Sequence, residues 1–357
     1  MPLTCFQSST RIGFASRRAG ECCLWGVHLR ALTVMLLGLL SALGADDAAK
    51  PRGWPPPPAE PYVVYVQTIT GPADLGIKPP TLKRFVNWVT GAGQDTAQLV
   101  KPFGVALDDA GNLLLTDTGA RAVYCLDRAR KKWLRWEQTG KTRFQSPVAV
   151  ARQHDTIFVA DSGLGRVLAF DLKGRPRFEI SRELERPSGL AVFGEKLFIA
   201  DAQRHQVVIC SLSGGFISKF GRRGGNPGEF NFPTHIAADS NGRLLVTDSM
   251  NCRIQIFEPS GQFRRVIGSP GDGPGHFSRP KGVAVDQLGH IYAVDAVFDN
   301  VQIFDDQGRL LLNWGEAGPD PGQFWLPNGI AVSRENEIYV ADSYNRRIQV
   351  FRYTGKQ

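Results

Sequence analysis

The sequence has few of the residues that build disulfide frameworks and metal centres, since its 357 residues include only six cysteines and six histidines. After residue 45 the cysteines are Cys125, Cys210 and Cys252, an odd number that does not indicate a disulfide framework. The last two differ by about five residues in their place within repeated units, roughly 16 Å along a strand and beyond disulfide reach. We expect all three thiols to be free, with Cys125 and Cys210 as small core residues.

A strong charge of one sign is also absent. The formal net charge is +8, and residues 1–45 contribute +3 of it through four arginines and one glutamate. The remaining excess of about +5 is modest and gives no nucleic-acid signature, so no nucleic-acid partner is expected. The 39 glycines and 23 prolines are spread along the chain, which excludes collagen-like and all-helical folds and predicts many short strands joined by tight turns.

A long apolar run occurs only at residues 31–45, ALTVMLLGLLSALGA, which follow an arginine-bearing stretch and end in small residues. This pattern is typical of a secretory signal peptide cleaved after Gly44 or Ala45, and it is short for a membrane span of about 20 residues. We predict an exported protein, periplasmic or extracellular, with residues 1–45 as signal peptide or, if uncleaved, as a membrane anchor. Residues 46–61 are predicted to be a Pro-rich linker and residues 62–84 an N-terminal extension.

A short unit recurs six times over the rest of the chain. The prolines that open its copies lie 45, 40, 46, 47 and 47 residues apart, at Pro102, Pro147, Pro187, Pro233, Pro280 and Pro327. Each copy holds three strand-like runs separated by turn residues, as in RPKGVAVDQLGHIYAVDAVFDNVQIFDDQG from Arg279, and a fourth run follows in the better copies. Four antiparallel strands with apolar residues on both faces of the first two predict a propeller blade. The predicted fold is all-β, a six-bladed β-propeller of four-stranded antiparallel blades over residues 85–357.

The sixth copy has no fourth strand of its own, so ring closure requires one from the start of the chain. Residues 84–104, RFVNWVTGAGQDTAQLVKPFG, parallel residues 310–329, LLLNWGEAGPDPGQFWLPNG, down to the Asn-Trp pairs. We therefore predict that Phe85–Val89 forms the outer strand of the last blade. The strand-like run YVVYVQTIT at residues 62–70 lies outside the repeat and receives no predicted partner.

These units resemble the NHL repeat family, whose copies carry a Pro-x-Gly-[IV]-Ala start and an Asp-Ser-x-Asn-x-Arg-[IV]-Gln-[VI]-Phe middle. The clearest copy is LPNGIAVSRENEIYVADSYNRRIQVFRYTG from Leu326, and the likeness extends over residues 85–353. The head GWPPPPAEPYVVYVQTITGPADLGI is similar to that of exported bacterial NHL proteins of unassigned function. The resemblance implies a six-bladed propeller.

Six aspartates recur once per unit at the end of the second strand: Asp117, Asp161, Asp201, Asp248, Asp295 and Asp342. A ring of carboxylates would suit catalysis or metal binding. Ser, Thr or Ala follows each one, however, as in an Asx-type turn that satisfies backbone N–H groups between two strands. We therefore interpret the aspartates as structural turn residues.

Histidine placement bears on an enzymatic alternative. In the peptidyl-amidoglycolate lyase branch of similar propellers, the resemblance implies zinc-binding histidines directly after the blade-opening proline in three blades. Those positions here are Phe103, Val148, Ser188, Thr234, Lys281 and Asn328. His235, one residue further on, replaces the glycine of most copies and is expected to line the central channel as a wall residue. No metal or other cofactor is predicted, and a calcium-dependent, lactonase-like enzyme stays an alternative.

In a four-stranded antiparallel blade, the loops that follow the second and fourth strands emerge on one face. These loops are rich in arginine and asparagine, which suits recognition of an acidic or polar partner. The candidate binding residues are Arg222, Arg223, His235, Arg279, Lys281, Trp325, Asn328, Arg346 and Arg347. Arg222, Arg223 and Lys281 lie outside the repeat pattern and are preferred. The repeated arginines have an alternative role, in which they fasten turns by hydrogen bonds.

The sequence therefore favours a non-catalytic binding scaffold in the cell envelope that recognises a protein, peptide or glycan through this loop face. The alternative is a metal-dependent lyase or hydrolase with its site at the mouth of the central channel. RNA binding, as in intracellular TRIM-NHL proteins, conflicts with the predicted export signal. Contact with a membrane is expected only through an uncleaved N-terminal segment.

Overall fold

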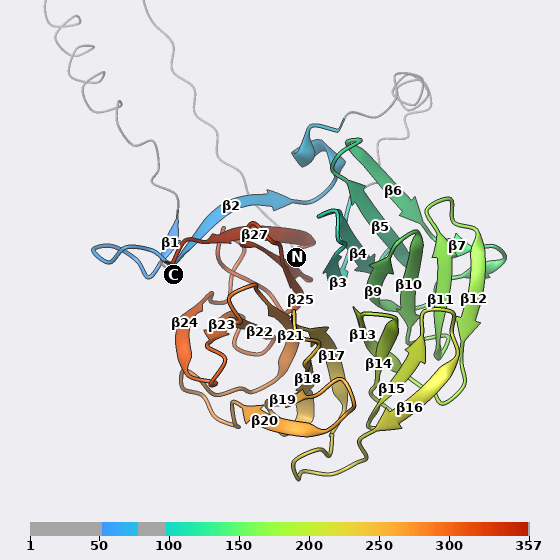
Figure 1. The fold of residues 1–357 in the computed structure, drawn as a ribbon. Coiled ribbons are helices and arrows are strands. Elements are labelled where there is room, and N and C mark those ends of the chain that lie inside the picture. The colour runs from blue at the N-terminus through green and yellow to red at the C-terminus, as the bar shows by residue number, and fades with distance from the viewer. Residues whose placement is uncertain (1–51, 78–97, 356–357) are drawn as a thin grey trace, which may run out of the picture. The chain divides into compact units, whose positions relative to one another are not determined.

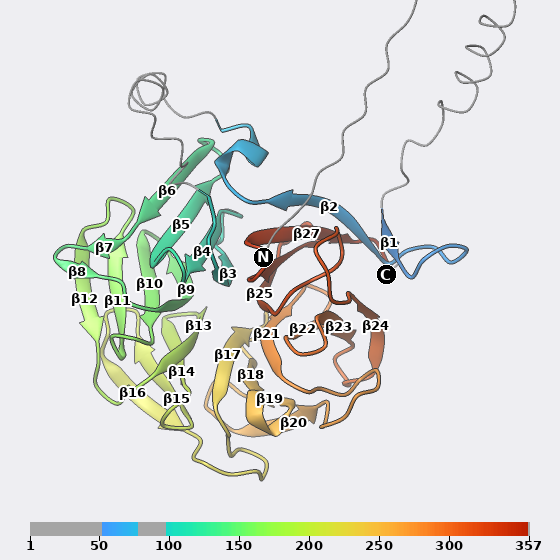
Figure 2. The same cartoon turned by 180° about the vertical axis from the view of Figure 1, so that it is seen from behind.

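The computed structural model describes residues 52–77 and 98–355, which form antiparallel sheets arranged around one axis (Figures 1 and 2). Helix is limited here to two 3₁₀ turns, Pro72–Leu75 (η1) and Ser249–Asn251 (η2). The predicted all-β, six-bladed propeller is confirmed. The segments predicted as signal peptide (residues 1–45) and as closing strand (residues 85–89) lie outside the described residues. Within the described ranges, no helix is long and apolar enough to span a membrane.

The first three blades follow one another along the chain. Blade 1 contains β3 (Pro102–Leu107), β4 (Leu113–Asp117), β5 (Ala122–Asp127) and β6 (Lys132–Trp136). A small hairpin follows, made of β7 (Gln138–Thr139) and β8 (Thr142–Arg143). Blade 2 contains β9 (Pro147–Gln153), β10 (Thr156–Asp161), β11 (Arg166–Asp171) and β12 (Pro176–Ile180). Blade 3 contains β13 (Pro187–Phe193), β14 (Lys196–Asp201), β15 (Gln206–Ser211) and β16 (Phe216–Phe220).

Blades 4 to 6 complete the ring. Blade 4 contains β17 (Pro233–Ala238), β18 (Leu244–Asp248), β19 (Arg253–Phe257) and β20 (Phe263–Ile267). Blade 5 contains β21 (Pro280–Val285), β22 (Ile291–Asp295), β23 (Asn300–Phe304) and β24 (Leu310–Trp314). Blade 6 contains β25 (Pro327–Val332), β26 (Glu337–Asp342), β27 (Arg347–Tyr353), β2 (Val63–Ile69) and the short outer strand β1 (Gly53–Trp54). Each blade thus starts at a predicted proline, and its first strand faces the axis.

Closure of the last blade by an N-terminal strand is confirmed, but the strand predicted for it is wrong. β2, and not Phe85–Val89, pairs antiparallel with β27, with Val63 opposite Tyr353 and Ile69 opposite Ile348. Val63 and Ile69 are buried, so β2 supplies apolar side chains to the cores on both sides of the sixth blade. Residues 85–89 resemble the fourth strands of other blades in sequence, but β2 occupies the free edge of β27.

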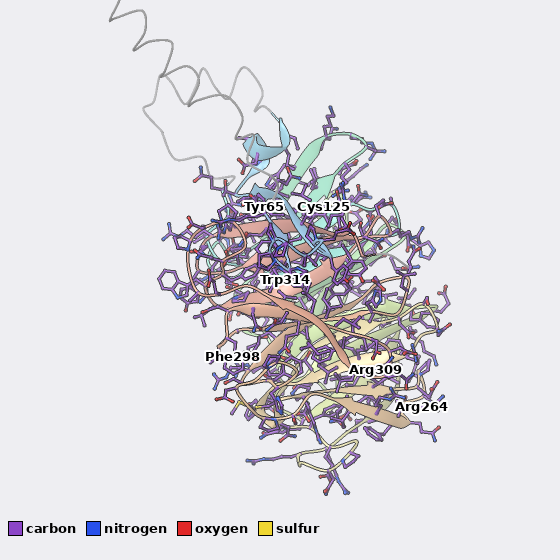
Figure 3. The ribbon with its side chains drawn as sticks, turned by 90° about the vertical axis from the view of Figure 1, so that its left-hand side faces the viewer. Tyr65, Cys125, Arg264, Phe298, Arg309 and Trp314 are labelled. Atoms are coloured by element: carbon purple, nitrogen blue, oxygen red, sulfur yellow. The ribbon has the colours of Figure 1, made fainter. Side chains whose placement is uncertain are left out.

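One cluster of buried apolar side chains fills each space between adjacent blades of the described chain. Between blades 5 and 6, for example, Val63, Trp314 and Phe351 pack together. Trp314 lies within the molecule, whereas Arg264 projects from its surface (Figure 3). The second strands are buried on both faces because a blade contacts a neighbour on each side, which explains their continuous apolar sequence.

Candidate functional site

The six repeated aspartates are fully buried turn residues. The Asp295 carboxylate accepts N–H bonds from Ser278 and Arg279 before β21, at 2.7 and 3.0 Å. It also accepts N–H bonds from Val297 and Phe298 in the turn after β22, at 2.9 and 3.2 Å. The interpretation of these residues as structural turns is therefore confirmed. Each aspartate ties the entry of its blade to the turn between the second and third strands.

The repeated arginines of the third strand have the structural role that was the alternative to binding. Arg347 is only 8% exposed, and its guanidinium donates to the Asp342 carboxylate at 2.7 Å and to three carbonyls of the preceding spacer. Arg253 makes the same type of contact with Asp248 at 2.8 Å and with two spacer carbonyls. Arg347, a predicted binding residue, is thus turned into the protein.

Three of the other predicted arginines are exposed but lie away from the centre of the ring. Arg346 lies in the turn before β27, and Arg222 and Arg223 lie in the spacer before β17. Arg222 forms an ion pair with Glu229 at 2.8 Å, which compensates its charge locally. None of the three lines the cavity at the channel mouth.

The turns after the second strands and the spacers before the first strands share one side of the propeller, here called the loop face. Its centre is a cavity of about 410 Å³, here called the mouth cavity. Five of the six residues that follow a blade-opening proline line it: Phe103, Val148, Ser188, Thr234 and Lys281. Blades 1 to 5 therefore all contribute to this cavity.

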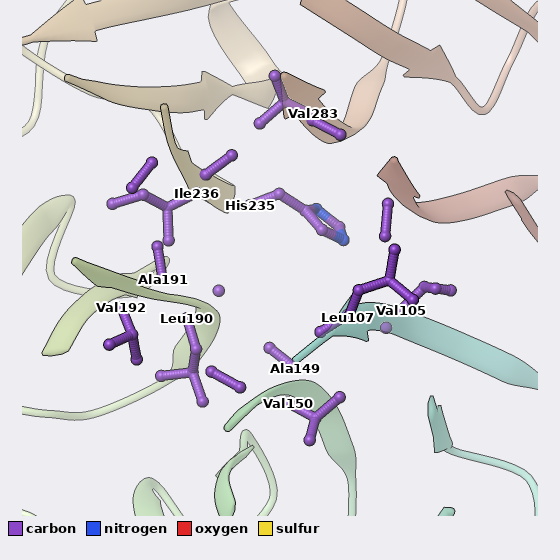
Figure 4. Close-up of a pocket in the computed structure, with 18 of the residues that line it drawn as sticks. Val105, Leu107, Ala149, Val150, Leu190, Ala191, Val192, His235, Ile236 and Val283 are labelled. Atoms are coloured by element: carbon purple, nitrogen blue, oxygen red, sulfur yellow. The ribbon is translucent and has the colours of Figure 1, made fainter. Parts of the chain in front are cut away.

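Close packing of the inner strands explains the glycine of the Pro-x-Gly motif. A Cβ atom on Gly282 would lie 2.4 Å from the Asn328 carbonyl oxygen, and one on Gly329 would lie 2.4 Å from the Phe103 carbonyl oxygen. Both distances are far too short, so neighbouring blades approach along backbone atoms. His235 occupies this position in blade 4, and its side chain projects into the channel from β17 (Figure 4).

His235 separates two parts of the axial channel. It lines the mouth cavity and also a second cavity of about 260 Å³ between the inner strands. Its ring stacks against Phe103 at 6.1 Å between centroids, and neither ring nitrogen has a hydrogen-bond partner in the described chain. Burial, reinforced by the Lys281 ammonium, lowers the pKa of His235 to about 3. The imidazole is therefore neutral at physiological pH.

Three cationic side chains meet at the mouth cavity: Arg186, Arg279 and Lys281. Arg186 and Arg279 both precede a blade-opening proline, in blades 3 and 5, and are exposed at the rim. Lys281 is half-buried, and burial, together with the two arginines, lowers the pKa of its ammonium. Within residues 52–77 and 98–355, none of the three cations forms an ion pair with a carboxylate. The cavity is consequently electropositive.

The loop face also carries exposed apolar side chains. Trp325 is 55% exposed and its ring lies 5.5 Å from that of Tyr344, over which the Lys101 ammonium lies at 4.4 Å. Together with other residues of the same face they form a set, here called the apolar arc, made of Val100, Met250, Val297, Trp325 and Tyr344. Met250 also lines the mouth cavity. Asn328, a predicted binding residue, is half-buried beside the channel, and its Oδ1 has no partner in the described chain.

The described residues contain no group of three or more His, Cys, Asp or Glu side chains that could hold a metal ion. The prediction of free thiols is confirmed for Cys125, Cys210 and Cys252. Burial raises the pKa of the Cys125 and Cys210 thiols to about 11, so both are protonated and unreactive at neutral pH.

The fold and the axial cavity together define a β-propeller with six blades. A family model described as "6-bladed beta-propeller" matches residues 238–299, and one described as "NHL repeat" matches residues 324–351. The chain is thus a six-bladed propeller, as the resemblance implied, and its sixth blade contains the segment that matches the NHL repeat.

Solved structures of low sequence identity share this fold. A streptogramin B lyase matches with a TM-score of 0.54 and 14% identity over 71% of this chain and 93% of its own. An auxiliary nutrient binding protein from Bacteroides thetaiotaomicron matches with a TM-score of 0.57 and 13% identity over 72% of this chain and 70% of its own. Hydrazine synthase from Kuenenia stuttgartiensis matches with a TM-score of 0.53 and 13% identity, over 74% and 99%. The likeness concerns the fold, which carries enzymes and binding proteins alike.

Of the residues predicted from sequence, the structure brings His235, Arg279 and Lys281 together in one cavity. Trp325 and Arg346 lie elsewhere on the same face. Sequence reasoning missed Arg186 and Phe232 as cavity residues, and it missed Met250 and Tyr344 as exposed apolar ones. The sequence could have indicated Arg186 and Phe232 as cavity residues, because both directly precede a blade-opening proline, as Arg279 does.

Proposed function

We propose that the protein is a non-catalytic binding scaffold that holds a peptide segment of a partner protein on its loop face. The observation that carries this proposal is the apolar arc, whose five large side chains are each 44 to 55% exposed and come from four consecutive blades, 4, 5, 6 and 1. Exposed apolar side chains gathered on one face mark interaction sites when they are contiguous and rimmed by polar groups.

The chemistry of the arc favours a peptide over a glycan. Val100, Met250 and Val297 are aliphatic, and aliphatic and methionine side chains pack against apolar peptide side chains more readily than against sugar hydroxyls. Lys101 and Arg279 stand beside the arc and supply positive charge. The fitting partner segment therefore combines apolar residues with acidic ones.

A location in the cell envelope is part of the proposal and depends on the apolar run at residues 31–45. A partner exposed in the same compartment is expected. Cleavage is tested by N-terminal sequencing of the protein recovered from its native host, where a mature chain that begins at Asp46 or Ala45 supports export.

The binding function is tested by selecting random displayed peptides on the purified protein and measuring their affinities for variants. We expect peptides to be selected that bind the wild type, and to bind at least about tenfold more weakly to a Trp325→Ala, Tyr344→Ala double variant because both anchors are removed. Leu288→Ala is the matched control, since Leu288 is 45% exposed in a turn on the opposite face.

Failure to select any binding peptide contradicts the proposal, and so does equal binding to the double variant and the wild type. A further variant, in which Arg222→Glu and Arg223→Glu reverse two charges, tests the pair of arginines preferred from the sequence. Weaker binding there would extend the contact surface outward to the spacer before β17.

A further inference from the structure

The mouth cavity combines apolar walls with a few polar groups in the manner of a small-molecule site. Phe103, Val148 and Phe232 provide apolar lining, and the volume of about 410 Å³ falls within the range of ordinary ligand pockets. His235 lines its inner side, next to the second axial cavity. A ligand that enters from the loop face therefore meets the imidazole rather than an open passage.

Two buried polar groups at this inner side have no hydrogen-bond partner among the described residues. They are the Thr234 hydroxyl and the neutral His235 imidazole, whose side chains both line the cavity. A buried polar atom without a hydrogen-bond partner destabilises a folded protein. Both groups can donate or accept one hydrogen bond, so they are suited to a polar group of a ligand.

The charge of the cavity determines the sign of that ligand. Lys281 is half-buried, and it is flanked by Arg186 and Arg279 without an ion-paired carboxylate in the described chain. A cation that is partly removed from water is stabilised by an anion beside it, because an unpaired desolvated charge is unfavourable. Asp295 is the carboxylate that favours the charged form of Lys281, but it already accepts hydrogen bonds from backbone N–H groups around its own turn.

We propose that the mouth cavity binds a small organic acid, with its carboxylate on Lys281 and its apolar body against Phe103, Val148 and Phe232. Arg186 and Arg279 attract and hold the carboxylate at the rim. An inorganic anion can pair with the cations but cannot pack against the apolar walls. A neutral apolar molecule can pack against the walls but cannot pair with the cations. This site goes beyond the proposed function, because its ligand is a small acid inside the mouth cavity and not a peptide on the apolar arc.

The test uses N-acetyl-L-phenylalanine, N-acetyl-L-leucine and N-acetyl-L-tryptophan as probes, with titration calorimetry and thermal unfolding as readouts. The amide of each probe serves as its uncharged control, and inorganic phosphate serves as an anion without an apolar body. We expect at least one acid to bind and to raise the melting temperature, and its amide and phosphate to bind at least about tenfold more weakly.

Lys281→Met and Arg279→Gln should each weaken binding of the acid, whereas Lys196→Met, at an exposed lysine at the start of β14, should leave it unchanged. The melting temperature of each variant without probe shows that it is folded. Equal binding of acid and amide overturns the inference, as does unchanged binding by Lys281→Met or a lack of binding by all three acids. A chain that binds the acids but selects no peptide upholds this site and refutes the proposed function, and the reverse result separates them equally well.

Discussion

The Ser343 hydroxyl donates a hydrogen bond to the carbonyl oxygen of Pro102 at 2.6 Å, across a sequence distance of 241 residues. The bond joins the turn after β26 to the first strand of blade 1. The same contact joins consecutive blades elsewhere, where Ser249 donates to the Pro280 carbonyl at 2.8 Å. The seam between the last and first blades is therefore built like the other joints, and β2 completes the outer side of blade 6.

Two valines of strand β2 should contribute unequally to the free energy of unfolding. Val63 is fully buried between blades 5 and 6, whereas Val66 on the same strand is 38% exposed. We expect Val63→Ala to lower the free energy of unfolding by about 2 kcal/mol, because it leaves a cavity, and Val66→Ala to change it by less than about 0.5 kcal/mol. Urea denaturation measures both. Equal effects of the two substitutions would mean that β2 does not pair with β27 in solution.

Substitutions of two adjacent arginines should change the free energy of unfolding by very different amounts. Arg347 is buried against Asp342, whereas Arg346 is exposed. Arg347→Met should lower the free energy of unfolding by about 3 to 5 kcal/mol, since it removes the cation paired with the buried Asp342 carboxylate and the guanidinium donor to three carbonyls. Arg346→Met should stay within about 0.5 kcal/mol of the wild type. Chemical denaturation compares them, and a small effect at Arg347 would contradict its structural role.

Acid should destabilise the wild type more than a variant without His235. The folded pKa of His235 is about 3, below the ordinary value of 6.5, so the unfolded chain binds a proton at this residue that the folded chain does not. Stability is therefore lost as the pH falls from 6.5 toward 3, and the loss is complete below that window. Denaturation of wild type and His235→Gln at several pH values measures the difference, in which the shared titration of the carboxylates cancels. Parallel pH profiles would show that His235 is not buried as described.

The fold was readable from sequence because each blade repeats the same local chemistry. The six prolines, the turn aspartates and the alternating apolar runs give the number of blades, the strand order and the face on which the loops meet. The role of β2 was not predicted, because its pairing with β27 depends on the open edge of the sixth blade and not on likeness to the repeat. The pairing of Val63 with Tyr353 leaves no trace in either segment alone.

The candidate site was readable only in part. His235 and Lys281 were recognisable because each departs from the repeat at a channel-facing position. Their proximity to Arg186 could not be predicted, since Arg186 comes from blade 3 and Lys281 from blade 5. The cavity that they share depends on the diameter of the propeller and on the position of the His235 imidazole in its channel. Exposure of Trp325 and Tyr344 likewise depends on the path of neighbouring turns, which local sequence does not specify.

The pairing of β2 with β27 has a consequence for how the chain matures. During synthesis β2 emerges before blades 1 to 5 and its partner β27 after them, with Val63 and Tyr353 separated by almost the whole propeller. The blades between them can form in order as they emerge, because each is a local meander of the chain. The sixth blade alone must wait until β27 has been synthesised. An incomplete chain therefore presents an unsealed ring and an unpaired strand, both of which a chaperone or protease can distinguish from the finished protein.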